Sequence, residues 1–94
     1  MTKTKNAPLS IPDQVRMAII YSVPIVNGKP SDLKDDGDLK NQYRFDAHTY
    51  QALCVNLQDV LDDNNCTKEL KCSDVSKCAT VKDVIDLITK TMAP

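Results

Sequence analysis

The side chains in this chain that are best suited to bind a metal ion or to act as nucleophile and base are four cysteines and one histidine, His48. The cysteines are Cys54, Cys66, Cys72 and Cys78, and five residues separate each neighbouring pair among the last three. Zinc sites favour two to four intervening residues, so we expect no metal site. A site that joins His48 to cysteines, or a Cys–His nucleophile, is an alternative, but no Gly-rich oxyanion-forming loop supports the nucleophile.

The state of the thiols is not fixed by the sequence. Helical periodicity places Cys54 and Cys78 on buried faces, where a free thiol behaves as a small apolar side chain. Cys66 and Cys72 flank a short loop and could pair with each other. Inside a cell such a bond would be absent or redox-responsive. The redox state of all four cysteines therefore stays open.

The elements that position these residues are helices, because apolar residues recur at spacings of three and four. A first helix over residues 11–22 follows Ser10, a favourable N-cap, and ends ahead of Pro24. A second helix over residues 47–61 follows the N-cap Asp46. The apolar face of this second helix consists of Tyr50, Leu53, Cys54, Leu57, Val60 and Leu61.

Two further helices are expected in the last third of the chain. Ser73 is the predicted cap of a short helix over residues 74–78, and Thr80 with Asp83 predicts a capping box for the last helix. The apolar stripe of that helix is Val81, Val84, Ile85, Ile88 and Met92. No run is typical of a strand. The sequence therefore predicts an all-α bundle of three main helices plus one short helix.

The first connection, residues 24–45, is long and rich in turn-forming residues. Loops of this length are uncommon in a compact domain, so apolar side chains should hold it to the bundle. The candidates are Val26, Leu33, Leu39, Tyr43 and Phe45. Residues 1–9 are predicted to be a flexible polar tail, which leaves one domain over residues 10–92. The composition, 41% apolar and 27% charged, is ordinary for a globular domain.

This order of helices resembles the acyl carrier protein family. The resemblance is carried by Asp46-Ala47-His48-Thr49 with Leu53 and Leu57, by Cys78 to Ile88 with its Thr80-Val81-Lys82-Asp83 start, and by the helix from Val15 to Val23. It implies a carrier fold and a role in acyl-chain metabolism of the fatty acid or polyketide type. It also implies a protein that is not an enzyme and that docks acyl-chain enzymes or a phosphopantetheinyl transferase.

Position 47 is the main departure from the family. There a serine directly after the aspartate carries 4′-phosphopantetheine, whereas this chain has Ala47, which has no hydroxyl. We therefore expect no cofactor on this chain unless Ala47 replaces a native serine. Thr49 lies two positions late for the arm, and threonine is not its usual acceptor. Ser31 lies in the loop without the family's sequence context. His48 stands where the family usually has a large aliphatic residue.

The resemblance also implies a set of partner-docking residues on the second helix. They are Asp46, His48, Thr49, Gln51 and Asp59. This helix is less acidic than the family pattern, because polar neutral side chains such as Asn56 and Gln58 occupy its exposed side. An alternative hypothesis is therefore a non-carrier protein-interaction module that retains the carrier fold.

Charge and hydropathy limit the partners further. Residues 29–63 hold eight acidic and four basic side chains, a local net charge of −4. That balance argues against nucleic acid and leaves room for a basic protein partner, although a solvated acidic surface explains it equally well. No apolar run approaches the roughly 20 residues that span a bilayer, and no apolar segment of a secretory signal follows the first lysines. We expect a cytoplasmic monomer, or an organellar one if a targeting segment was removed.

Overall fold

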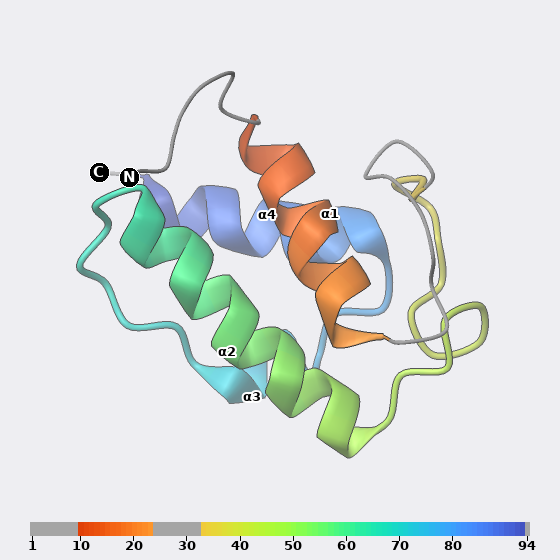
Figure 1. The fold of residues 1–94 in the computed structure, drawn as a ribbon. Helices are drawn as coiled ribbons and strands as arrows, with labels where there is room; N and C mark the ends of the chain where they lie inside the picture. Colours follow the sequence, from red (N-terminus) through yellow and green to blue (C-terminus); the bar gives the residue numbers. More distant parts are fainter. Residues whose placement is uncertain (1–9, 24–32, 94) are drawn as a thin grey trace.

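The computed structural model describes residues 10–23 and 33–93, and these form four helices with no strand (Figure 1). The helices are α1 (Ile11–Ser22), α2 (Ala47–Asp63), α3 (Cys72–Val75) and α4 (Val81–Met92). The predicted all-α bundle of three main helices and one short helix is confirmed. The predicted tail over residues 1–9, Val26 and Ser31 lie outside the described residues.

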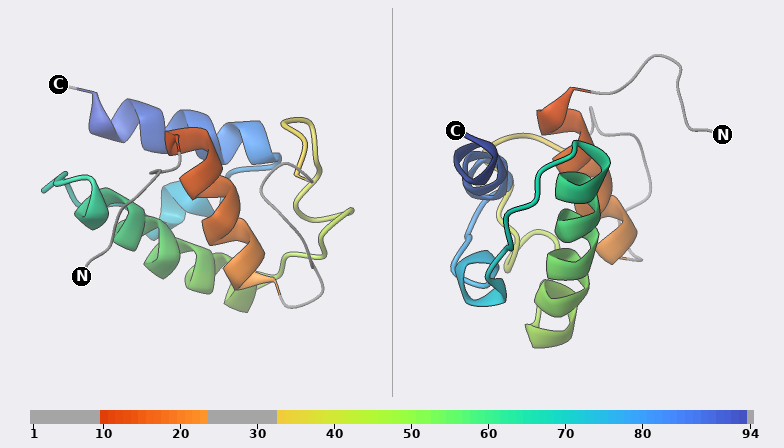
Figure 2. Two further views of the ribbon diagram at one scale, coloured as in Figure 1. Left: turned by 45° about the horizontal axis from the view of Figure 1, so that its top comes forward. Right: turned by 90° about the vertical axis from the view of Figure 1, so that its left-hand side faces the viewer.

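The helices pack around one aliphatic core. α1 lies across α2 and α4, and α3 packs against both α2 and α4 (Figures 1 and 2). The largest fully buried side chains are Ile19, Leu39, Leu53, Leu57, Leu61, Ile88, Val15, Val75, Val81 and Val84. None of the described helices has both the length and the apolar content to cross a bilayer.

The predicted helix starts at Ser10, Asp46 and Thr80 are confirmed by their hydrogen bonds. The Ser10 hydroxyl accepts the Asp13 N–H at 3.3 Å, and Thr80 and Asp83 form a reciprocal capping box at the start of α4. These contacts satisfy backbone donors that the first helical turn leaves without partners.

The helix α2 was predicted to end at residue 61, but it continues for two more residues, to Asp63. The N–H of Asn64 still bonds to Val60 and Leu61 carbonyls, and Asn65 then adopts a left-handed backbone with φ of 61°. Asparagine tolerates this conformation better than most residues, so the chain reverses here and not at Asp62.

The predicted position of α3 is wrong. The helix covers Cys72–Val75 instead of residues 74–78, and the Ser73 hydroxyl does not cap it, because Ser73 lies inside the helix. Its N-cap is Lys71, which makes no side-chain capping bond. The helix is positioned by tertiary contacts instead: a disulfide at Cys72 and the fully buried side chain of Val75.

The second half of the first connection is bound to the start of α4. The N–H of Leu39 donates to the Ala79 carbonyl at 2.9 Å, and Val81 N–H donates to the Gly37 carbonyl at 3.1 Å. Arg16 of α1 forms an ion pair with Asp35 of the same connection. The expected anchors in the described part are all buried, and they are Leu33, Leu39, Tyr43 and Phe45. The long connection is therefore a packed part of the bundle.

Candidate functional site

The start of α2 presents Ala47 to solvent directly after its N-cap. The Asp46 carboxylate accepts the backbone N–H of Thr49 and the Thr49 hydroxyl, both at 2.9 Å. These two hydrogen bonds hold the pKa of Asp46 below its ordinary value, with a smaller contribution from the charge of His48. Asp46 and Thr49 are therefore engaged in capping, while Ala47 and His48 are exposed.

A hollow of about 280 Å³ opens between this first turn and α3. Its lining consists of Ala47, Tyr50, Gln51, Cys72, Ser73 and Ser76. The Tyr50 hydroxyl donates to the Cys78 carbonyl at 2.7 Å, and its ring meets the Phe45 ring edge-on at a centroid distance of 5.0 Å. Tyr50 thus fixes the start of α2 against the segment that joins α3 to α4.

The expected docking residues do not form one cluster. The structure brings together Asp46, Ala47, His48, Thr49 and Gln51 in the first turns of α2. Asp59 lies three turns further on, about 16 Å from His48 along the helix axis at the rise of an α-helix. His48 and Asp59 share one exposed face of α2, but Asp59 also faces α1. A single small partner contact would not cover the whole predicted set.

The structure pairs two cysteines in a way that the sequence did not suggest. Cys54, for which a buried free thiol was the main interpretation, forms a disulfide with Cys72, and the alternative Cys66–Cys72 pair is not formed. The bond joins α2 to α3 with a Cα–Cα distance of 5.5 Å.

The cause of this pairing is the path of the chain after α2. That segment returns along the helix (Figure 1): the N–H of Cys66 bonds to the Leu61 carbonyl and the N–H of Leu70 bonds to the Gln58 side chain. The segment thus passes Leu61 and then Gln58 on its way back along α2, and Cys72 comes to lie beside Cys54. Cys66 stays behind, beside the end of the helix.

Cys66 and Cys78 are free thiols, and Cys78 is buried as expected. Burial raises the pKa of Cys78 to about 11, with further contributions from the charges of Asp83 and Asp74. Within the described ranges, no three His, Cys, Asp or Glu side chains lie close enough together to hold a metal ion.

The two free thiols should differ sharply in reactivity. At pH 8, a thiol with a pKa of about 11 is only ~0.1% thiolate, the form that reacts with iodoacetamide. In the native, non-reduced protein we expect Cys66, which is partly exposed, to be alkylated at least about tenfold faster than Cys78. Peptide mass spectrometry over time measures both rates. Alkylation of Cys54 or Cys72 without reductant would contradict the disulfide.

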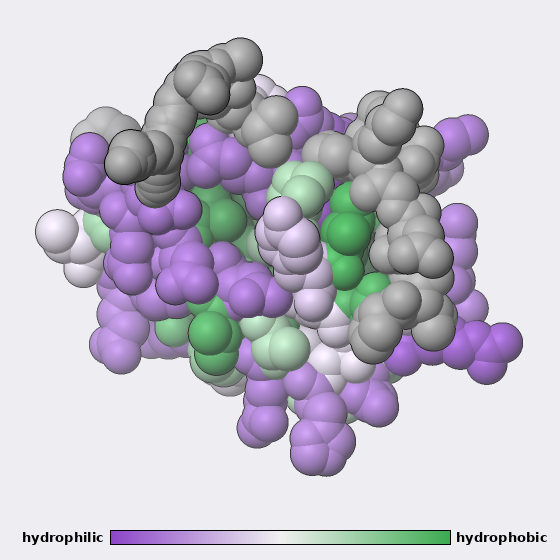
Figure 3. All heavy atoms as spheres, viewed as in Figure 1, coloured by the Kyte–Doolittle hydropathy of each residue, from purple (hydrophilic) through white to green (hydrophobic). Residues whose placement is uncertain are grey.

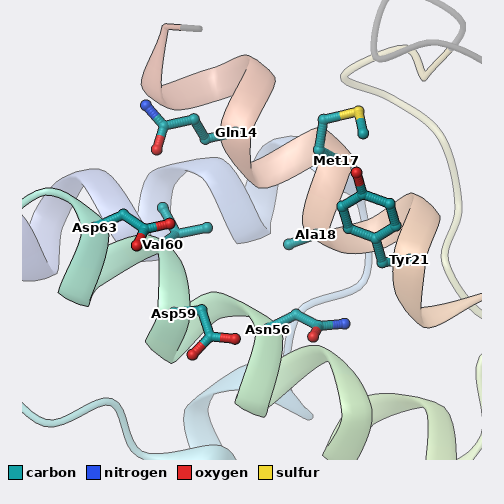
Figure 4. Close-up of a pocket in the computed structure, with 8 residues that line it drawn as sticks. All are labelled: Gln14, Met17, Ala18, Tyr21, Asn56, Asp59, Val60 and Asp63. Carbon is teal, nitrogen blue, oxygen red and sulfur yellow. The ribbon is translucent and has the colours of Figure 1, made fainter. Parts of the chain in front are cut away.

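A second hollow, of about 360 Å³, lies between α1 and α2 and was missed by the sequence analysis (Figure 4). Met17 and Tyr21 lie on its α1 side, and Asp59 and Asp63 lie on its α2 side. The available signal was Tyr21, a large ring outside the apolar stripe of the first helix. Its side chain is 72% exposed.

No protein-family model matches the chain, and neither a curated protein nor a solved structure matches it. The carrier family therefore stays a resemblance, and the function has to be inferred from the geometry around α2.

Proposed function

We propose that this chain is an acyl-carrier-like protein of acyl-chain metabolism, fatty acid or polyketide type, that acts as a docking scaffold without a prosthetic arm. The observation that carries the proposal is the place of Ala47. It is exposed, it directly follows the N-cap Asp46, and it borders the hollow between α2 and α3. A residue in this position is accessible to a partner enzyme from outside the bundle.

The residues present do not fit attachment of 4′-phosphopantetheine. Attachment at position 47 needs a hydroxyl oxygen, and Ala47 has a methyl group. The neighbouring Thr49 hydroxyl donates to Asp46, and the other hydroxyls at the hollow, those of Ser73 and Ser76, belong to its α3 side and not to position 47. In this proposal the domain carries no cargo on a prosthetic arm, and its contribution is a shaped surface.

That surface is the first turns of α2, where His48 and Gln51 are exposed beside Ala47. The hydrogen bond from the Tyr50 hydroxyl to the Cys78 carbonyl holds this surface in place. A rigid backbone lowers the entropic cost of ordering that accompanies binding. The partners are acyl-chain enzymes or a phosphopantetheinyl transferase, which would recognise the helix start and not an arm.

Restoring the hydroxyl tests this proposal directly. The Ala47→Ser variant, incubated with a broad-specificity phosphopantetheinyl transferase and CoA, is expected to gain the mass of one phosphopantetheine. The unchanged chain should gain none. Ala52→Ser is a matched control, because Ala52 is also an exposed alanine of α2 but lies more than one turn further on. Intact-protein mass spectrometry measures the gain.

Two outcomes would count against a carrier-type surface. One is an Ala47→Ser variant that keeps its helical circular dichroism and stays unmodified. The other is equal modification of Ala52→Ser, since a transferase that recognises the helix start should not accept both positions.

The second candidate is a non-carrier interaction module that retains this helix arrangement. The observation in its favour is Val55, whose side chain is 63% exposed on the same face of α2 as His48 and Asp59. An exposed apolar residue between polar ones is typical of a protein contact. An unmodified but folded Ala47→Ser variant would favour this candidate over the carrier-like one.

A further inference from the structure

The groove between α1 and α2 combines an apolar wall with an acidic one. Met17 and Tyr21 extend from α1 on the same side, and Asp59 and Asp63 stand opposite on α2 (Figure 4). The small side chain of Ala18, which is almost fully buried, leaves the space between the helices open. This groove is separate from the first turns of α2, on which the proposed function depends.

Hydrogen bonds between α1 and α2 fix the two ends of the groove. At one end the Asn56 side-chain amide donates to the Ser22 hydroxyl at 2.9 Å, and that hydroxyl donates to the Ala18 carbonyl at 2.7 Å. At the other end the Asn64 amide donates to the Gln14 side chain at 2.8 Å. The helices are thus held apart at a set distance, and a ligand would find the groove already formed.

The charges at the groove are of one sign. α2 contains no lysine or arginine, and the one cation of α1, Arg16, is bound to Asp13 and Asp35 away from the groove. Asp59 and Asp63 form no ion pair with any described residue. Two carboxylates beside an apolar surface favour an occupant that supplies positive charge.

The apolar wall is exposed enough to act as an anchor. Tyr21 is 72% exposed, so its ring is accessible to a partner. The ring offers a large contact area and loses little side-chain entropy when it is bound. Figure 3 shows this face of the molecule, where separate hydrophobic residues are visible over α1 and α2 within a mostly hydrophilic surface.

We propose that this groove binds a cationic amphipathic helix of a partner protein. An apolar side chain of that helix packs against Met17 and Tyr21, and two Lys or Arg residues contact Asp59 and Asp63. The two carboxylates are one helical turn apart, about 6 Å along the axis, which matches basic residues at positions i and i+4 of the ligand.

A model ligand tests the acidic wall. The probe is a dye-labelled synthetic peptide of about 14 residues, with leucines on one helical face and lysines one turn apart on the other. Fluorescence anisotropy should show about tenfold weaker binding to Asp59→Asn/Asp63→Asn than to the unchanged protein, and this difference should shrink in high salt. The charge-matched control is Asp36→Asn/Glu69→Gln, both exposed and outside the groove lining.

A second pair of variants tests the apolar wall. Tyr21→Ala should weaken peptide binding about fivefold or more, while Leu87→Ala, a partly buried apolar residue of α4 that does not line the groove, should leave it within about twofold. Amide shifts of the labelled protein should centre on the groove. The proposal fails if both charge variants lose affinity equally, or if shifts centre on the first turns of α2. It also fails if the groove variants abolish self-association of the chain instead, which would make a second copy the occupant.

Discussion

Removing the disulfide between α2 and α3, by Cys54→Ala with Cys72→Ser, is expected to lower the free energy of unfolding by about 3 kcal/mol. The bond spans 18 residues of sequence, and closing a loop of that size restricts the unfolded chain by an amount of this order. Cys54 is buried, so alanine is the better replacement there, while the exposed Cys72 accepts serine. Urea denaturation followed by circular dichroism measures the change.

Reduction of the unchanged protein provides the control. A phosphine reductant should lower the free energy of unfolding of the unchanged chain by the same amount and leave that of the double variant unaffected. The loss should be largest around α3, because that helix has only four residues and no side-chain cap. Hydrogen exchange should therefore speed up at Val75 and Ser76 more than in α4. A stability that is equal with and without reductant would contradict a structural role for the bond.

Shortening Leu39 to alanine is expected to destabilise the protein by about 2–5 kcal/mol, as for a fully buried core leucine. The effect would be unusual for a residue of a long connection. It follows from the complete burial of the Leu39 side chain and from the bond between its N–H and the Ala79 carbonyl. The same urea experiment measures it.

Lys34→Ala is the matched control, because Lys34 lies in the same connection and is exposed. Its stability should stay within about 0.5 kcal/mol of the unchanged protein. If both variants lose equally little stability, the connection is not part of the core, and the attachment of residues 35–39 to the start of α4 would be wrong.

The parts of the fold that could be predicted are those set by local chemistry. Ser10, Asp46 and Thr80 cap their helices through contacts within three residues, so the sequence alone locates these helix starts. The apolar stripes of α1, α2 and α4 likewise follow from spacing. The buried leucines of the first connection were predictable because a long loop in a small domain needs apolar anchors.

The parts that could not be predicted depend on how the chain returns on itself. α3 is four residues long, and its position is set by Cys72 and Val75 more than by helix propensity. The partner of Cys72 was equally unpredictable, because it depends on the path of the segment that runs back along α2. The groove beside Asp59 requires the placement of two helices, which no single-helix pattern contains.

The attachment of the first connection to α4 also bears on how fast the protein folds. Leu39 and Ala79 are roughly 40 residues apart in sequence, and α2 and α3 lie between them. Contacts of this separation cost loop-closure entropy before they contribute any stability. Only residues 64–80 separate α2 from α4, so these two helices can pair before the connection joins the start of α4. We therefore expect substitutions at Leu39 to speed unfolding more than they slow folding.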